Sequence, residues 1–190
     1  MSYHKIMTRI FFLLSLGMTF LSAQTTRINL SWDLGSESDL YLYRIFRATS
    51  PNASSQLDSV QAPQNSYDDG NVQKGVLYYY RLKSVDFSLN SSDYSNELSA
   101  AIPKISGLNS SEVLPPDTTI QIPLDDHVYD PDDADNTLLW TITGANRLTV
   151  SITNRVASIS TPSDWDAQET LLFSVKDDQG FEDTHSMTIR

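Results

Sequence analysis

Hydrophobic and polar positions alternate most clearly over residues 75–86, GVLYYYRLKSVD. Every second position from Tyr78 to Ser84 is aromatic, apolar or small, and the positions between them hold Tyr79 and two basic residues. A two-residue period is that of a β-strand with one buried face, and aromatic residues suit such a pleated surface. The pattern therefore predicts a central strand that turns Tyr78 towards the core.

Shorter alternating runs, bounded by Gly, Asn, Asp, Ser and Pro, lie before and after this strand. Many short strands with such turns are typical of a β-sandwich. We therefore expect an all-β chain of two tandem immunoglobulin-like β-sandwiches after a leader, with Trp32, Trp140 and Trp165 in their cores. The further strands are predicted at 28–32, 38–49, 56–60, 95–101, 118–123, 150–152, 156–159, 171–175 and 185–190, and residues 66–69 are expected to lead by a turn into the central strand.

Residues 1–23 have the pattern of a secretory signal peptide. Lys5 and Arg9 give a positive start, residues 10–21 are apolar, and the small pair Ser22-Ala23 precedes the expected cleavage point. The apolar run is well short of the roughly 20 residues that a membrane-spanning helix needs, which favours cleavage over an uncleaved anchor. We expect a mature chain that is secreted or lies at the cell surface and has no membrane span.

The motifs of residues 24–103 follow one another as Ile28-x-Leu-x-Trp, Tyr43-x-Ile-x-Arg, Tyr67-Asp-Asp, Gly75-x-x-Tyr-x-Tyr-Arg-Leu and Ser95-Asn-Glu-x-Ser-Ala. This order resembles the fibronectin type III domains of secreted bacterial proteins. The resemblance implies a tyrosine corner, in which the hydroxyl of Tyr78 bonds to upstream backbone. It also implies a strand before Ile28, which this chain nearly lacks. We expect the exposed edge either to be covered by residues 24–27 or to accept a partner strand.

The motifs of residues 104–190 are Asp130-Pro-Asp-Asp-x-Asp, Leu139-Trp-x-Ile, Arg155-Val-Ala-x-Ile, Asp164-Trp and Phe173-Ser-Val-x-Asp-Asp-x-Gly. They resemble the cadherin-like, immunoglobulin-like repeats of bacterial surface proteins, which are related to the dystroglycan-type fold. The pair Asp166-Ala167 departs from the Asn-Gly of many relatives. The last strand usually continues beyond the position of Arg190, so this domain is expected to be truncated at its C-terminus.

The net charge of −11 is concentrated in the second half of the chain. Residues 24–103 hold nine acidic and six basic side chains, whereas residues 104–190 hold fifteen and five. Such a surface repels phosphate backbones, which argues against nucleic-acid binding, and attracts cations. The absence of cysteine excludes disulfides and thiolate chemistry, and three histidines leave little material for an imidazole metal site.

The acidic residues of the second half gather in two loops, around Pro131 and before Gly180. Calcium prefers six to eight oxygen ligands, several of them carboxylates, from a flexible loop. In cadherin-like folds, as the resemblance implies, acidic end loops hold calcium at a domain junction. The alternative is that these aspartates bond their own backbone and cap turns. The predicted calcium ligands are Asp130, Asp132, Asp133, Asp135, Asp177 and Asp178.

Motifs of nucleophilic, zinc-dependent or phosphate-transfer enzymes are absent from the sequence, and the clustered aspartates suit solvated loops better than an active site. The sequence predicts a non-catalytic extracellular module for binding, adhesion or spacing, with a protein or glycan ligand at the cell surface. It is expected to be the N-terminal part of a larger protein. The alternatives are a carbohydrate-binding accessory region of a polysaccharide-degrading enzyme, with Tyr41, Phe46 and Tyr79 stacking on sugar rings, and a hydrolase with paired carboxylates.

Overall fold

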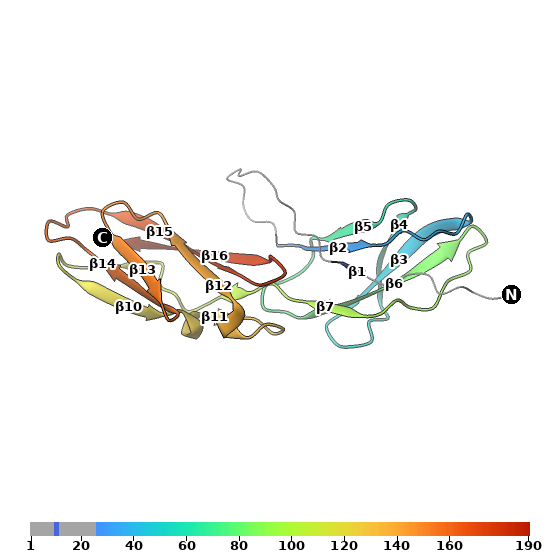
Figure 1. Cartoon of the computed structure of the whole chain (residues 1–190), viewed down its shortest axis with the longest axis horizontal. Coiled ribbons are helices and arrows are strands. Elements are labelled where there is room, and N and C mark those ends of the chain that lie inside the picture. The colour runs from blue at the N-terminus through green and yellow to red at the C-terminus, as the bar shows by residue number, and fades with distance from the viewer. Residues whose placement is uncertain (1–9, 12–25) are drawn as a thin grey trace. The chain divides into compact units, whose positions relative to one another are not determined.

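The computed structural model describes residues 10–11 and 26–190. The predicted signal peptide and its cleavage point lie outside these residues, except for Ile10–Phe11. The described chain consists of β-strands and two single-turn 3-10 helices, which confirms the all-β prediction. Its contacts divide it into two compact units, Met1–Ala101 and Ile102–Arg190 (Figure 1).

The first unit contains two antiparallel sheets with a common core. Trp32 from one sheet lies edge-on against Tyr43 from the other, with ring centroids 5.3 Å apart, and both side chains are buried. The three-stranded sheet has the order β1 (Ile10–Phe11), β2 (Ile28–Trp32), β5 (Ser66–Asp69), and the four-stranded sheet has the order β4 (Gln56–Gln61), β3 (Leu40–Ala48), β6 (Tyr78–Asp86), β7 (Leu98–Ala100).

The alternation that predicted the central strand is confirmed in β6. Tyr78, Tyr80, Leu82 and Ser84 are buried. Tyr79, Arg81 and Lys83, which lie between them, are half-exposed. Val85, which the alternation places on the outward face, is buried as well, so the alternation holds only as far as Ser84. The strand therefore packs one face on the core and turns the other outward.

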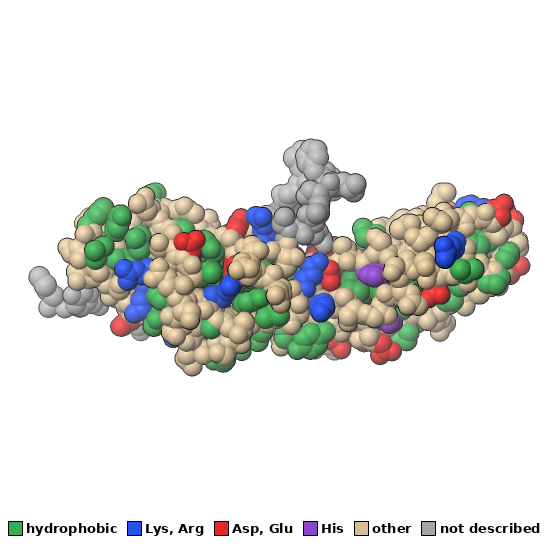
Figure 2. All heavy atoms as spheres, turned by 180° about the vertical axis from the view of Figure 1, so that it is seen from behind, with side chains coloured by type: hydrophobic (Ala, Val, Ile, Leu, Met, Phe, Trp, Pro, Cys, Tyr) green, Lys and Arg blue, Asp and Glu red, His purple; other side chains and the backbone are tan. Residues whose placement is uncertain are grey.

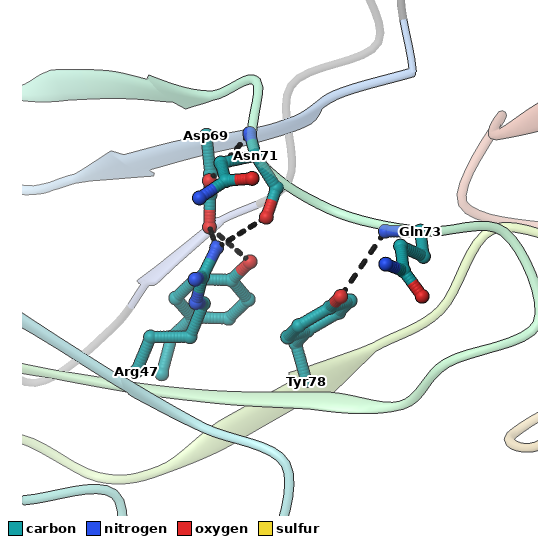
Figure 3. A network of polar contacts seen from close by, with 6 residues as sticks. Arg47, Asp69, Asn71, Gln73 and Tyr78 are labelled. Carbon is teal, nitrogen blue, oxygen red and sulfur yellow. Dashed lines mark hydrogen bonds and ion pairs between the residues drawn. The ribbon is translucent and has the colours of Figure 1, made fainter. Parts of the chain in front are cut away.

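The tyrosine corner is also confirmed. The Tyr78 hydroxyl accepts a hydrogen bond of 3.1 Å from the backbone amide of Gln73, five residues upstream (Figure 3). This bond ties the loop before β6 to the strand itself. Tyrosine at this position thus serves packing and loop closure.

A buried polar network lies beside the corner. Asp69 Oδ2 accepts hydrogen bonds from the Tyr80 hydroxyl at 2.8 Å and from Arg47 Nη1 at 2.7 Å (Figure 3). Asp69 Oδ1 accepts the backbone amide of Asn71 at 3.0 Å, so both oxygens of this buried carboxylate are satisfied. The network joins strands of both sheets through side chains alone.

One edge of β2 is paired with β1 at Ser31 and Trp32. Ile10 lies opposite Trp32 and Phe11 opposite Ser31 in antiparallel register. Arg27 lies just outside β2 and forms an ion pair with Asp68. Residues from the predicted signal peptide thus take the position of the first strand, while Gln24 and Thr25 lie outside the described residues.

The second unit is built around one hydrophobic cluster that includes Trp140 and Trp165. The tryptophan positions predicted from the sequence are confirmed in both units, since all three indoles are buried. The strand orders are β12-β15-β16-β9, β10-β14-β13 and β11-β8, and only β16 and β9 pair in parallel. Their bounds are β8 Lys104–Ile105, β9 Ser111–Glu112, β10 Thr119–Pro123, β11 Val128–Tyr129, β12 Leu139–Thr143, β13 Thr149–Thr153, β14 Val156–Ser160, β15 Glu169–Lys176 and β16 Glu182–Ile189, with 3-10 turns at Leu124–His127 and Asp135–Thr137.

On the face drawn in Figure 2, green hydrophobic side chains lie in small groups between polar atoms, and blue and red charged groups are interspersed. Within residues 10–11 and 26–190, no helix has the length and apolar character needed to span a membrane.

Candidate metal centre

Two loops of the second unit hold the predicted calcium ligands. One begins at Asp130, directly after β11, and the other begins at Asp177, directly after β15. Asp130 Oδ1 accepts backbone amides of Asp132 at 3.1 Å and Asp133 at 3.4 Å, which closes the first loop as an aspartate turn. Asp177 Oδ1 accepts the Phe181 amide at 2.8 Å in the β15–β16 hairpin.

The second carboxylate oxygens have a different environment. Among the described residues, Oδ2 of Asp130, Asp133 and Asp177 and Oε1 of Gln179 are buried and have no hydrogen-bond partner. Asp130 and Asp177 are each only 7% exposed. A buried carboxylate oxygen without a partner is costly, because it has lost its water and gained nothing in exchange. The turns therefore use one oxygen of Asp130 and of Asp177 and leave the other available.

Three aspartates of the first loop form a close group, and Asp177 of the second loop is near enough for their charges to act on it. Ligand atoms of Asp130, Asp132 and Asp133 lie within 4.8 Å of one another. Burial raises the pKa of Asp177 to about 7, and the neighbouring charges of Asp130 and Asp133 contribute to the rise. Burial, followed by the charges of Asp178 and Asp130, also raises the pKa of Asp133. The two loops thus bring like charges together across the chain.

The remaining predicted ligands lie further out. Asp178 is exposed, although its charge acts on Asp133. Asp135 is exposed at the start of a 3-10 turn and is not part of the close group of Asp130, Asp132 and Asp133. The structure thus joins the two loops through a subset of the six aspartates.

Gln179 was not predicted from the sequence. Its amide oxygen is buried and has no hydrogen-bond partner among the described residues. In the sequence it follows two aspartates and precedes Gly180, and no motif distinguishes it from any surface glutamine. Asp183, a further acidic residue near the second loop, differs from the candidate ligands because both of its carboxylate oxygens have hydrogen-bond partners. It is buried, but its Oδ2 accepts the Ile105 amide at 2.7 Å and its Oδ1 accepts the Thr184 amide at 2.7 Å, so it fastens β8 to β16.

The donor set fits a hard divalent cation. It offers carboxylate and amide oxygens with no nitrogen or sulfur, which is the chemistry that calcium selects. Within the part of the chain that the structure describes, no lysine or arginine forms an ion pair with Asp130, Asp133 or Asp177. A cation bound there would satisfy the unpaired oxygens and remove the repulsion between the loops.

Comparisons with known proteins give structural similarities alone. No protein-family model matches the chain. No curated protein matches it either. Among solved structures, an Fn3-like protein from Clostridium thermocellum is 20% identical, with a TM-score of 0.40, and the match covers 53% of this chain and 95% of that one.

Two further solved structures are similar to this chain over different shares of their own length. The fibronectin(III)-like modules of CbhA from Clostridium thermocellum are 11% identical over 87% of this chain and 85% of theirs, with a TM-score of 0.35. Pectate lyase PelI from Erwinia chrysanthemi is 19% identical, with a TM-score of 0.37, over 50% of this chain but only 28% of its own length. Similarity at this level carries no inference about activity or ligand.

Proposed function

We propose that this chain is a non-catalytic extracellular module, a spacer or binding arm, whose second unit is stabilised by a calcium ion. One observation carries the calcium assignment. Buried oxygens of Asp130, Asp133, Asp177 and Gln179, from two loops, lack a partner among the described residues. An ion bound to both loops would hold them together, which suits a domain that has to keep its shape outside the cell.

The pocket of the second unit that Glu112 and His127 line does not offer the paired carboxylates of a hydrolase. A hydrolase with paired carboxylates needs two acidic groups facing each other across a cleft. The second unit has a pocket of about 260 Å³, but Glu112 is the one acidic residue in its lining. His127 also lines this pocket. Its Nδ1 lies 3.3 Å from the Ser106 carbonyl oxygen, so this ring nitrogen is hydrogen-bonded to the backbone.

The aromatic platform expected for a carbohydrate-binding region is not formed by the three predicted residues. Phe46 is buried, because the ring of Tyr94 lies edge-on against it with centroids 5.0 Å apart. Tyr41 is stacked on Phe87 at 5.4 Å, and both Tyr41 and Tyr79 are half-buried. Stacking of sugars on Tyr41, Phe46 and Tyr79 therefore has no support in the first unit.

Thermal unfolding of residues 24–190 tests the calcium assignment. Calcium at 100 times its dissociation constant adds about 2.7 kcal/mol to the free energy of unfolding. We therefore expect the Tm of the second unit to rise by about 10 °C or more at this calcium concentration relative to chelator, since 1 kcal/mol moves the Tm of such a domain by about 4–8 °C. Magnesium should have a smaller effect, because it demands a more regular shell.

Matched variants separate specific binding from a general salt effect. Asp130→Asn and Asp177→Asn keep an oxygen that can close each turn but remove the charge, and both should abolish the calcium shift. Asp135→Asn, in the exposed 3-10 turn, should keep it. The assignment is wrong if calcium leaves the Tm unchanged, or if Asp130→Asn and Asp177→Asn shift as the unsubstituted chain does.

A further inference from the structure

The outer face of the four-stranded sheet in the first unit holds two basic residues side by side. Arg44 in β3 lies directly opposite Lys83 in β6. Their neighbours in sequence, such as Tyr43 and Leu82, are buried, so both basic side chains project outward. Like charges directly opposite one another on adjacent strands destabilise a sheet. Cross-strand pairing alone therefore does not favour this pair.

Neither residue is neutralised. Across residues 10–11 and 26–190, no acidic side chain lies within ion-pair distance of Arg44 or Lys83. Acidic groups are plentiful in a chain with 24 of them against 13 basic ones. Six other basic residues do have a carboxylate partner: Arg27, Arg47, Arg81, Arg147, Arg155 and Lys176. Arg44 and Lys83 differ from these six because they lie opposite each other without a carboxylate partner in the described part of the chain.

Neighbouring side chains contact both cations. The Lys83 ammonium lies 4.2 Å from the ring centroid of Tyr94, and the Arg81 guanidinium lies 4.1 Å from the same centroid. Arg44 Nη1 donates a hydrogen bond of 3.1 Å to Ser91 Oγ. A cation over an aromatic face is attracted by the ring without losing its charge. These contacts orient the basic groups but leave their charge available.

The segment that carries Ser91 and Tyr94 is itself fixed to β6. Ser92 Oγ accepts the Ser84 amide at 3.1 Å, and Ser95 Oγ accepts the Leu82 amide at 3.0 Å. Their backbone amides in turn donate to carbonyl oxygens of β6. The positions of Ser91 and Tyr94 on this face are therefore fixed by hydrogen bonds between their segment and β6.

We propose that Arg44 and Lys83 bind carboxylate groups of an acidic polysaccharide. The guanidinium fork of arginine matches the two oxygens of a carboxylate. Ser59, opposite Arg44 on β4 and exposed, and Ser91 on the other side supply hydroxyls for sugar hydroxyls. Arg81 adds positive potential, although Glu97 already lies 3.5 Å from its Nε.

Charge density favours this ligand over a nucleic-acid duplex. A uronate chain carries at most one charge per sugar, so two unneutralised cations are enough to pair with neighbouring sugars. Nucleic acid carries one charge per nucleotide of each strand and binds through many basic contacts. A protein with a net charge of −11 would repel such a dense polyanion away from this one face.

Retardation of residues 24–190 in native gels cast with polygalacturonate tests the proposal, with chelator present to prevent gelling by calcium. The matched neutral probe is the fully methyl-esterified polymer, which keeps the sugar rings and removes the carboxylate charge. We expect retardation by polygalacturonate, none by the ester, and binding at least tenfold weaker in the double variant Arg44→Gln/Lys83→Gln. Arg27→Gln, a partly exposed residue of the same unit that is paired with Asp68, should bind within twofold of the unsubstituted chain.

Other outcomes overturn the proposal. Equal retardation by the ester would show that charge is not recognised, and unchanged binding of the double variant would place any binding elsewhere. Stronger retardation by polyglutamate than by polygalacturonate would assign the face to acidic peptides. The double variant loses one exposed hydrogen bond and one cation–π contact and gains relief from the like-charge pair, so it should still unfold cooperatively with a Tm within a few degrees of that of the unsubstituted chain. Weaker binding by a variant that unfolds in this way is then a loss of contacts to the polymer.

Discussion

Two buried aspartates in this protein have opposite environments. Asp69 is 1% exposed, and Arg47, Tyr80 and the Asn71 amide satisfy both of its oxygens. Burial and the charge of Asp69 also raise the pKa of Tyr80, so that hydroxyl stays protonated and donates. Asp177 has one oxygen bonded and one without a partner among the described residues. The first carboxylate serves the fold, and the second is suited to an ion.

Replacement of Asp69 tests the first half of this contrast. Asp69→Asn keeps the shape but leaves Arg47, whose side chain is 19% exposed, without its ion pair. We expect the free energy of unfolding to fall by about 2–3 kcal/mol, somewhat below the roughly 3–5 kcal/mol of a fully buried pair. Urea unfolding measures it. Asp68→Asn, at the half-exposed pair with Arg27, should change stability by less than about 1 kcal/mol, and an equal loss in both variants would contradict the argument.

The pH dependence of the calcium-free chain tests the second half. The pKa of Asp177 is raised from 3.8 to about 7 in the folded state, mainly by burial, so the folded chain holds this proton more tightly than the unfolded chain. Its contribution to stability is complete below pH 4 and is lost as the pH rises to about 7. In chelator we expect Asp177→Asn to remove much of this fall between pH 5 and pH 7.5. A fall of unchanged size in Asp177→Asn would show that other groups cause it.

At the scale of elements, alternation in the sequence predicted which face of a strand is buried but not what covers the other face. The period of β6 and the tyrosine corner at Tyr78 were predicted correctly. Phe46 was assigned to the outward face of β3, where it does lie, yet it is buried by Tyr94 from a segment nearly fifty residues later. Such cover depends on long-range packing, which a two-residue period does not encode.

Long-range packing also decides which of the predicted aspartates can form the candidate metal centre. Each acidic loop was visible in the sequence, but their approach depends on β12 pairing with β15, which sets Leu139, after the first loop, opposite Lys176, before the second. Nothing in the sequence separated Asp133, which has a buried oxygen, from the exposed Asp135 two residues later. Gln179 had no signal at all, because an amide becomes a candidate ligand only through burial beside carboxylates.

A turn of the second unit gives a prediction about its strands. Gly144, directly after β12, has φ +95°, and a Cβ there would lie 2.4 Å from the carbonyl oxygen of Thr170 in β15. Both the backbone conformation and the contact oppose a side chain. We expect Gly144→Ala to lower the free energy of unfolding by about 2 kcal/mol or more. Gly70→Ala, with nothing within 4 Å of the added Cβ, is the matched control and should cost less than half as much.

For the whole molecule, the two supporting devices lie in different units. The Asp69 network belongs to the unit Met1–Ala101, and the candidate metal centre belongs to the unit Ile102–Arg190. The hydrophobic cluster around Trp140 and Trp165 consists only of residues from the second unit. One unit is therefore stabilised by an internal ion pair and the other, on our proposal, by a ligand.

The assignment of the two devices to separate units predicts independent effects on stability. Calcium should raise one calorimetric transition and Asp69→Asn should lower another, and the two changes should add within about 0.5 kcal/mol, as for sites that act independently. Trp32→Phe leaves Trp140 and Trp165 as the tryptophans of the chain, so its fluorescence reports on the second unit. In that background the calcium shift should persist unchanged when Asp69 is also replaced. Loss of the shift would mean that the first unit takes part in holding the ion, and the calcium site would then have to include residues from both units.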